Sequence, residues 1–173
     1  MRHLILICLV AALALGACGK GGDGGSGGSE GGPHSSPEAI AKAAVKAISA
    51  KDVKGLEALF PTDDLIRSAA TCKDSTRIDR QIKNIQRERA RIPRTMDASN
   101  LKGATLTYVR MEERKSETYK KGSERRGCTF NMDVTMKKIK VRFTIKKGEK
   151  TKEEGEGIKV VKFGDKGWYL VDL

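Results

Sequence analysis

The pattern of apolar and polar positions predicts helices in the first half of the chain. Ser36 can cap a helix that begins at Pro37, a residue that suits the first helical position. Asp52 and Thr62 are candidate caps of two shorter helical segments, which are separated by Pro61. At helical spacing, we expect the inward face of these segments to consist of Ile40, Ala44, Ala47, Ile48, Leu56, Leu59 and Phe60.

A longer helix is expected from about Asp74 to Ile92, with Pro93 as its end. Its apolar stripe consists of Ile78, Ile82, Ile85 and Ile92, interrupted late by Arg89. A second row recurs every three or four residues and comprises Arg77, Arg80, Asn84, Arg87, Arg91 and Arg94. We name its five arginines the arginine ridge. Guanidinium groups bind phosphate and carboxylate bidentately, so the ridge is a candidate docking surface for an anionic partner. The alternative is a solvated helix face, partly paired with acidic residues elsewhere.

Strand signals dominate the second half of the chain. Alternation from Ala104 to Met111 predicts a strand with Leu106 and Tyr108 on one face and Val109 and Met111 on the other. The polar segment that follows, residues 115 to 126, is typical of an extended hairpin or loop.

Two further alternating runs differ in phase. The first is Cys128, Phe130, Met132, Val134 and Met136, and the second is Ile139, Val141, Phe143 and Ile145. We expect a bulge, bend or tight turn at Lys137-Lys138, since a phase shift otherwise moves the apolar side chains to the other face. The charged segment from Lys147 to Gly157 is expected to be a loop. A hairpin is expected to join residues 158–163 to residues 168–173.

Helices followed by strands favour an α+β fold over an alternating α/β fold. Residues 37–173 suffice for a single domain with one core. N-terminal helices on a curved antiparallel sheet, ending in the hairpin Phe163-Gly164-Asp165-Lys166-Gly167-Trp168-Tyr169, resemble the cystatin-like roll of the nuclear-transport-factor superfamily. The resemblance implies a conical pocket between sheet and helices, where enzymes of that superfamily place His and Asp residues.

The first 17 residues resemble a bacterial lipoprotein signal peptide. Arg2 precedes an apolar run, Leu4 to Ala14, which is shorter than the ~20 residues that a membrane-spanning helix needs. The tetrapeptide Leu15-Gly16-Ala17-Cys18 resembles a lipobox, which implies cleavage before Cys18, lipidation of its thiol and anchoring in a membrane of the cell envelope. Gly19 in place of Asp then implies the outer membrane, facing the periplasm. The alternative is an ordinary signal peptide with an incidental cysteine.

Residues 18–36 comprise the lipidated cysteine and a Gly/Ser-rich tether, which we expect to be disordered with a reach of ~20–25 Å. The chain has 34 Lys and Arg against 22 Asp and Glu, a net charge of +12. This surplus favours an anionic envelope polymer, a lipid headgroup or an acidic protein as partner. The compartment, and an aromatic content of only 5% for base stacking, argue against nucleic acid. Alternatively, the charge only keeps the protein soluble.

Cys72 and Cys128 remain after Cys8 and Cys18 are accounted for, and two thiols in an oxidising compartment are expected to pair. With His34 assigned to the tether, the domain has no histidine. This excludes Ser-His-Asp and Cys-His catalysis and most zinc sites, so we expect no metal and no cofactor.

Three functions remain possible on the sequence. The favoured one is a non-catalytic, membrane-anchored envelope lipoprotein that binds through its basic surface. The second is a carrier or sensor of a small apolar or anionic molecule held in the cone of the roll, which requires a cavity of ligand size. The third is a histidine-free enzyme, for which Asp133, Tyr108 and Tyr119 are the candidate groups.

Overall fold

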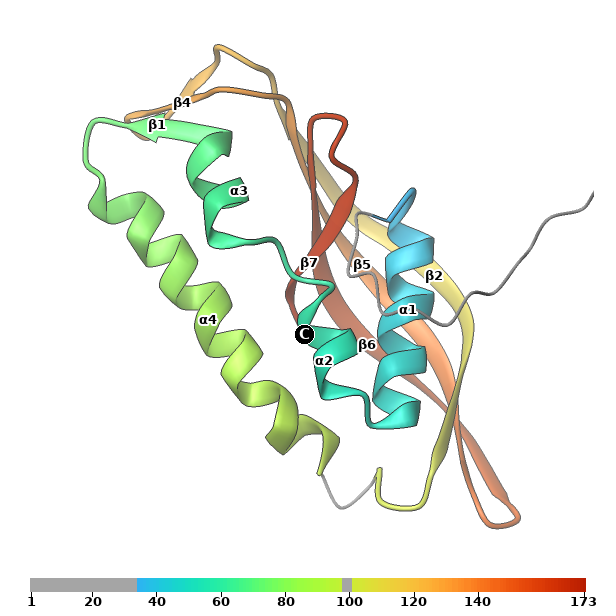
Figure 1. Cartoon of the computed structure of the whole chain (residues 1–173). Helices are drawn as coiled ribbons and strands as arrows, with labels where there is room; N and C mark the ends of the chain where they lie inside the picture. The colour runs from blue at the N-terminus through green and yellow to red at the C-terminus, as the bar shows by residue number, and fades with distance from the viewer. Residues whose placement is uncertain (1–33, 98–100) are drawn as a thin grey trace, which may run out of the picture.

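The computed structural model describes residues 34–97 and 101–173, so the predicted signal peptide, Cys18 and most of the tether lie outside the described residues. The helices form a layer against an antiparallel sheet, and the fold is α+β, as the order of the elements predicted (Figure 1). The elements are α1 (Pro37–Ala50), α2 (Val53–Glu57), α3 (Asp63–Ala69), β1 (Ala70–Cys72), α4 (Thr76–Met96), β2 (Thr105–Tyr119), β3 (Glu124–Arg125), β4 (Cys128–Phe130), β5 (Val134–Lys147), β6 (Lys150–Phe163) and β7 (Trp168–Asp172).

Polar side chains determine where the first three helices begin. Each cap accepts a hydrogen bond from the backbone N–H three residues later: Ser36 at 3.1 Å, Asp52 at 2.8 Å and Thr62 at 3.2 Å. Between α1 and α2, Lys51 adopts the left-handed conformation with φ 54°, which ends the first helix. All three predicted caps are confirmed.

The end of α4 differs from the prediction, because the helix continues through Pro93 to Met96. A proline inside a helix removes one backbone hydrogen bond and costs about 3 kcal/mol. Ile92 and Met96 are only 0% and 3% exposed, and burying such side chains stabilises by roughly 1.5–3 kcal/mol each. Only the burial of Met96 depends on the helix continuing, and it offsets at least half of the cost of the proline.

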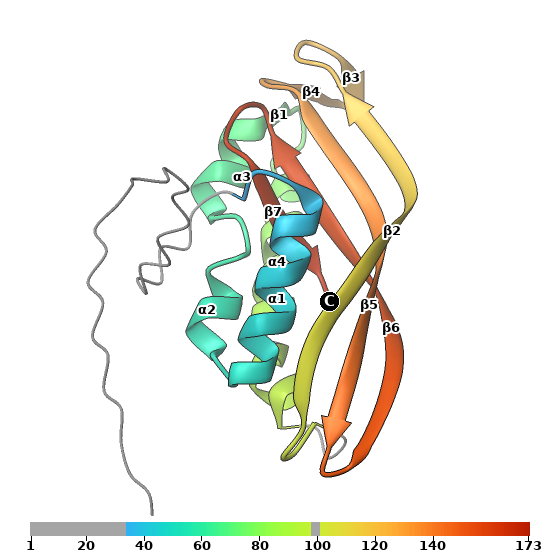
Figure 2. The ribbon, with the colours of Figure 1, turned by 90° about the vertical axis from the view of Figure 1, so that its right-hand side faces the viewer.

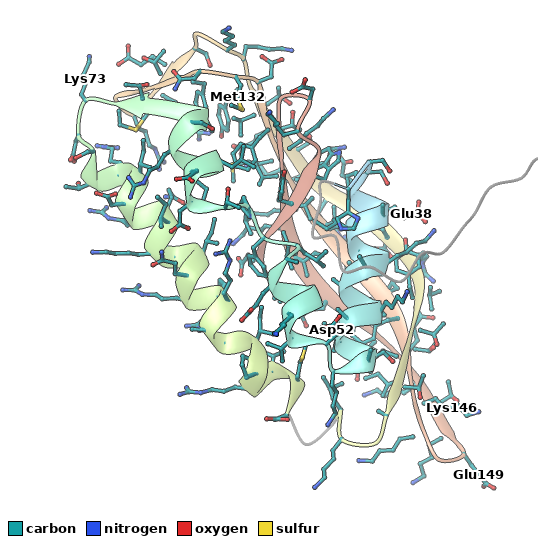
Figure 3. The ribbon with its side chains drawn as sticks, viewed as in Figure 1. Glu38, Asp52, Lys73, Met132, Lys146 and Glu149 are labelled. Carbon is teal, nitrogen blue, oxygen red and sulfur yellow. A yellow bond between two sulfur atoms is a disulfide. The ribbon has the colours of Figure 1, made fainter. Side chains whose placement is uncertain are left out.

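The strands form two antiparallel sheets, a main sheet in the order β2-β5-β6-β7 and a small sheet in the order β1-β4-β3. The helices lie on one side of the main sheet, and most of the opposite side carries no helix (Figure 2). The β5–β6 hairpin extends past the helical layer, with Lys146 and Glu149 near its tip (Figure 3).

The register of β2 differs from the predicted strict alternation, which changes the face on which one side chain lies. Its pairing with β5 shifts between Tyr108 and Arg110, so Val109 is an extra residue in a β-bulge. Leu106, Tyr108 and Met111 therefore all pack in the main core, while Val109 is 40% exposed. The prediction that Met111 lies opposite Leu106 was wrong, because strict alternation does not anticipate a bulge.

The predicted break at Lys137-Lys138 is also wrong, because β5 is continuous and pairs one-to-one with β6 there. The apolar positions change phase because the two faces of the sheet are buried at different ends of the strand. Ile139 lies in the main core under the helices, whereas Val134 lies in a second cluster with Ala69 of α3. The irregularity is instead in β2, whose register shifts beside Glu113.

The charged segment predicted as a loop is the first half of β6. Only Gly148 and Glu149 separate β5 from β6, and Lys147 pairs with Lys150. Gly148 has φ 59°, a conformation that tight hairpin turns require and glycine adopts readily. Backbone pairing holds this segment as a strand without apolar side chains.

Cys72 and Cys128 form a disulfide, as predicted. They lie directly opposite each other on β1 and β4. The bond therefore joins the segment between α3 and α4 to the segment that leads into β5.

Replacing both cysteines with alanine is expected to lower the free energy of unfolding by about 4 kcal/mol. The two cysteines are 56 residues apart, and the bond between them restricts the unfolded chain. Urea denaturation of the unlipidated chain from Gly19 onward, produced under oxidising conditions, measures this difference. The reduced parent protein is the control and is expected to match the double variant. A variant as stable as the oxidised parent would contradict the prediction.

Candidate functional site

The arginine ridge lies on the side of α4 that faces solvent. All five of its residues are exposed, namely Arg77, Arg80, Arg87, Arg91 and Arg94. The opposite side of the helix carries the buried Ile82, Ile85 and Ile92. Nitrogen-ended side chains extend from α4 away from the rest of the domain (Figure 3). The structure thus brings the predicted ridge residues together on one surface.

Few carboxylates neutralise the ridge. Arg91 Nη1 lies 3.0 Å from Oε1 of Glu88. Within the described residues, no carboxylate oxygen lies within 4.0 Å of any of the other four ridge arginines. Asp74 lies near the start of the ridge; hydrogen bonds from Thr76 lower its pKa, and the charges of Arg77 and Arg80 lower it further. The ridge therefore presents uncompensated guanidinium groups over ~26 Å of helix, at 1.5 Å per residue.

Arg89 differs from the ridge arginines because it lies on the inner side of α4. It is half-buried, and its Nη2 donates a hydrogen bond to the backbone oxygen of Pro61. This contact holds α4 against the connection between α2 and α3. Arg89 thus has a structural role, which explains why a basic residue interrupts the apolar stripe.

A partly open cavity of about 510 Å³ lies between α1, α4 and the helix-covered face of the main sheet. Small-molecule sites occupy roughly 300–1,000 Å³. The lining is mostly apolar and includes Ala44 and Ile48 of α1 and Phe143 of β5. The polar part of the lining consists of Glu88, Arg91, Thr95, Glu154 and Glu156. The cavity is the feature that the carrier hypothesis requires, although sequence patterns gave no means of locating its walls.

The carboxylate of Asp133 stabilises the turn after β2. It accepts hydrogen bonds from the backbone N–H of Lys121 at 2.8 Å and from Nζ of Lys120 at 2.9 Å. The backbone hydrogen bond, followed by that of Lys120, holds its pKa below the ordinary value. A general base for neutral pH needs a raised carboxyl pKa, so Asp133 is a poor candidate for catalysis.

The two candidate tyrosines are also outside the cavity lining. Tyr119 stacks on Phe130 with ring centroids 4.9 Å apart and donates a hydrogen bond to Glu117. Burial raises the pKa of Tyr108, and the neighbouring carboxylate of Glu38 raises it further. The raised pKa keeps the Tyr108 hydroxyl protonated at neutral pH, and the Tyr119 hydroxyl is engaged by Glu117.

The described ranges contain no group of three or more His, Cys, Asp and Glu residues placed to hold a metal ion. His34 pairs with Trp168, whose backbone N–H donates to the His34 oxygen at 2.9 Å, and burial lowers the histidine pKa. Paired structure thus starts three residues before the expected domain boundary at Pro37. No helix between residues 34 and 97 or after residue 100 is long and apolar enough to cross a membrane.

No protein-family model, no curated protein and no solved structure matches the chain. Its function therefore has to be inferred from its own surfaces.

Asp133 predicts a pH dependence of stability. Its folded-state pKa is lower than the ordinary 3.8, so its contribution is fully present above that value and is lost as the pH falls through the folded-state pKa. Thermal unfolding between pH 7 and pH 2.5 is expected to show a smaller acid-induced decrease in Tm for Asp133→Asn than for the parent. Asp165→Asn, at an exposed turn, is the control. Equal pH profiles for Asp133→Asn and the parent would refute the prediction.

Proposed function

We propose that this protein is a membrane-anchored, non-catalytic envelope lipoprotein that docks onto anionic lipid headgroups through the arginine ridge. The observation that carries the proposal is the exposed row of five arginines along α4, four of which have no carboxylate within 4.0 Å among the described residues. Guanidinium groups bind phosphate oxygens bidentately, and a row of them along one helix face can contact several headgroups of a planar membrane.

The proposed anchor favours lipid headgroups over a more distant partner. In this proposal, lipidation at Cys18 attaches the chain to the membrane, and the Gly/Ser-rich tether, which ends before the paired His34, gives the domain an r.m.s. reach of ~20 Å from it. A short flexible linker gives an effective concentration on the order of mM, so even weak docking to the same membrane is populated. Attachment to the outer membrane, facing the periplasm, is part of this proposal.

We also propose that the α+β domain is a cystatin-like roll. The helices on one side of the bent antiparallel sheet support this assignment (Figure 2). So does the cavity of about 510 Å³ between helices and sheet, where the roll has its cone.

Reversing three ridge charges tests the docking surface. Each basic residue near an anionic bilayer contributes about 1 kcal/mol, so Arg80→Glu, Arg87→Glu and Arg94→Glu together are expected to weaken binding by a factor of ~100 or more. The measurement is sedimentation of the unlipidated chain from Gly19 onward with vesicles containing anionic phospholipid. Parent binding is expected to decrease as salt rises and to be absent on zwitterionic vesicles.

The matched control reverses three exposed lysines away from α4: Lys102→Glu, Lys147→Glu and Lys150→Glu. This variant has the same net charge as the ridge variant and is expected to retain most of the binding. Equal losses in the two variants would show that net charge, rather than the ridge, drives association.

A second candidate function, carriage of a small molecule, is supported by the cavity. Because Glu88, Glu154 and Glu156 contribute to the lining, an apolar ligand fits better than the anionic one also considered from the sequence. The half-buried Ile48 lines the same cavity, so a larger side chain there reduces its volume.

Native mass spectrometry of the exported protein, purified without detergent, tests the carrier function. The expected result is a stoichiometric adduct on the parent that is lost in Ile48→Trp and kept in Ala50→Trp, an exposed position on the same helix. A bare parent mass would contradict this second function.

A further inference from the structure

A second basic surface lies on the side of the main sheet that faces away from the helices. A groove of about 470 Å³ is lined there by Arg114, Lys138, Lys140, Lys159, Gly155 and Gly157. Four of these residues are cations, and no acidic residue lines the groove. We call this feature the sheet groove. It is formed by β2, β5 and β6, whereas the arginine ridge belongs to α4.

Three lysines lie directly beside one another across the strands. Lys138 of β5 pairs with Lys115 of β2 on one side and with Lys159 of β6 on the other. Side chains at paired positions have Cβ atoms only about 4.5–5.5 Å apart, and like charges there are destabilising. Glu117 contacts Lys115 at 2.6 Å and Asp172 contacts Lys159, so among the described residues Lys138 is the member of the row with no carboxylate within 4.0 Å.

Carboxylates compensate the sides of the groove but not its centre. Arg114 and Lys159 each contact a carboxylate, on Glu112 and Asp172 respectively. Across the described chain, none lies within 4.0 Å of Nζ of Lys138 or Lys140. Lys138 and Lys140 therefore have no direct ion pair with the described residues; Glu112 lies opposite Lys140 on β2, and the hydrogen bond of Lys115, followed at a distance by the charge of Lys138, lowers the pKa of Glu117.

Two glycines form the floor of the groove. Gly155 lies opposite Arg142, and a Cβ atom there would come within 2.8 Å of Lys140 Cε and 3.0 Å of Arg142 Cδ. The two long side chains therefore lie across this glycine. At Gly157 an added Cβ would meet no atom within 4 Å, so the surface is open there. The missing side chain at Gly157 allows a ligand to approach the backbone closely there.

The pKa of a neighbouring carboxylate, Glu112, is consistent with the positive charge of this surface. Burial by itself raises the pKa of Glu112, but the hydrogen bond and charge of Arg142, together with Arg114 and Arg110, outweigh it and lower the pKa overall. The local excess of cations thus stabilises negative charge on this face.

We propose that the sheet groove binds a linear phosphate-bearing polymer. The tetrahedral phosphate presents acceptor oxygens in several directions, so one group can accept hydrogen bonds from ammonium groups on neighbouring strands. Lys138 and Lys140 are about 6.7 Å apart along β5, and adjacent strands are about 4.8 Å apart, which suits closely repeated charges. No aromatic residue lines the groove, so base stacking, on which single-stranded nucleic acids depend, is missing. The assignment is independent of the ridge and of the lipid anchor.

Binding of linear inorganic polyphosphate to the unlipidated chain from Gly19 onward, measured by isothermal titration calorimetry, tests this proposal. Lys138→Gln with Lys140→Gln is expected to weaken binding at least tenfold and to reduce the slope of log K against log salt by about 1.5–2. The same double variant is expected to unfold at an unchanged or higher temperature, because it relieves like-charge repulsion. That combination distinguishes a lost binding site from a damaged fold.

Gly157→Val provides an independent variant. Its side chain enters open space and valine suits a strand, so the fold is expected to persist while the groove is filled and affinity falls at least fivefold. Lys147→Gln with Lys150→Gln, at exposed positions outside both the groove lining and the ridge, is the matched control and is expected to leave polyphosphate binding within twofold of the parent. Binding retained by both groove variants, or lost equally in the control variant, would overturn the proposal. Equal affinity for poly-glutamate would overturn the assignment to phosphate, and equal affinity for oligothymidylate would overturn the preference for a polymer without bases.

Discussion

The apolar contact between the helices and one face of the main sheet determines how the other parts of the domain are arranged. Ile40 of α1, Leu56 of α2, Ile92 of α4, Val160 of β6 and Leu170 of β7 are all fully buried in it. Burial stabilises by about 25 cal/mol per Å² of apolar surface and has no directional preference, so it determines which faces turn inward. The polar and charged side chains are consequently displaced to the outer side of α4 and to the uncovered side of the sheet.

The net charge of +12 is not spread evenly over the domain. The ridge presents arginines along one helix, while the sheet groove is mainly lysine and arises where three strands meet. Three glutamates, Glu88, Glu154 and Glu156, line the partly open cavity instead. Guanidinium groups are planar and bidentate, whereas ammonium groups act as compact point charges, so the two basic surfaces suit different arrangements of anions.

These surfaces are compatible with one another under the proposed function. A domain docked on a membrane through α4 leaves the uncovered side of the sheet free, because that side belongs to a different layer of the fold (Figures 1 and 2). The candidate catalytic groups, in contrast, are engaged in structure: Asp133 with Lys120 and Lys121, and Tyr119 with Phe130. A binding role accounts for more of the described side chains than catalysis does.

Features that depend on neighbours along the chain were predictable from the amino-acid sequence. Local hydrogen bonding identified the caps Ser36, Asp52 and Thr62, helical periodicity placed the arginine ridge on one side of α4, and the count of cysteines identified the disulfide. The continuation of α4 through Pro93 could not be predicted from the local pattern, because the packing of Met96 against residues distant in the chain offsets a local penalty. The faces of β2 and β5, and the proximity of Lys115, Lys138 and Lys159, likewise depend on contacts between distant segments. Register between strands depends on bulges and on which face is buried at each end, and neither is encoded in a single strand's alternation.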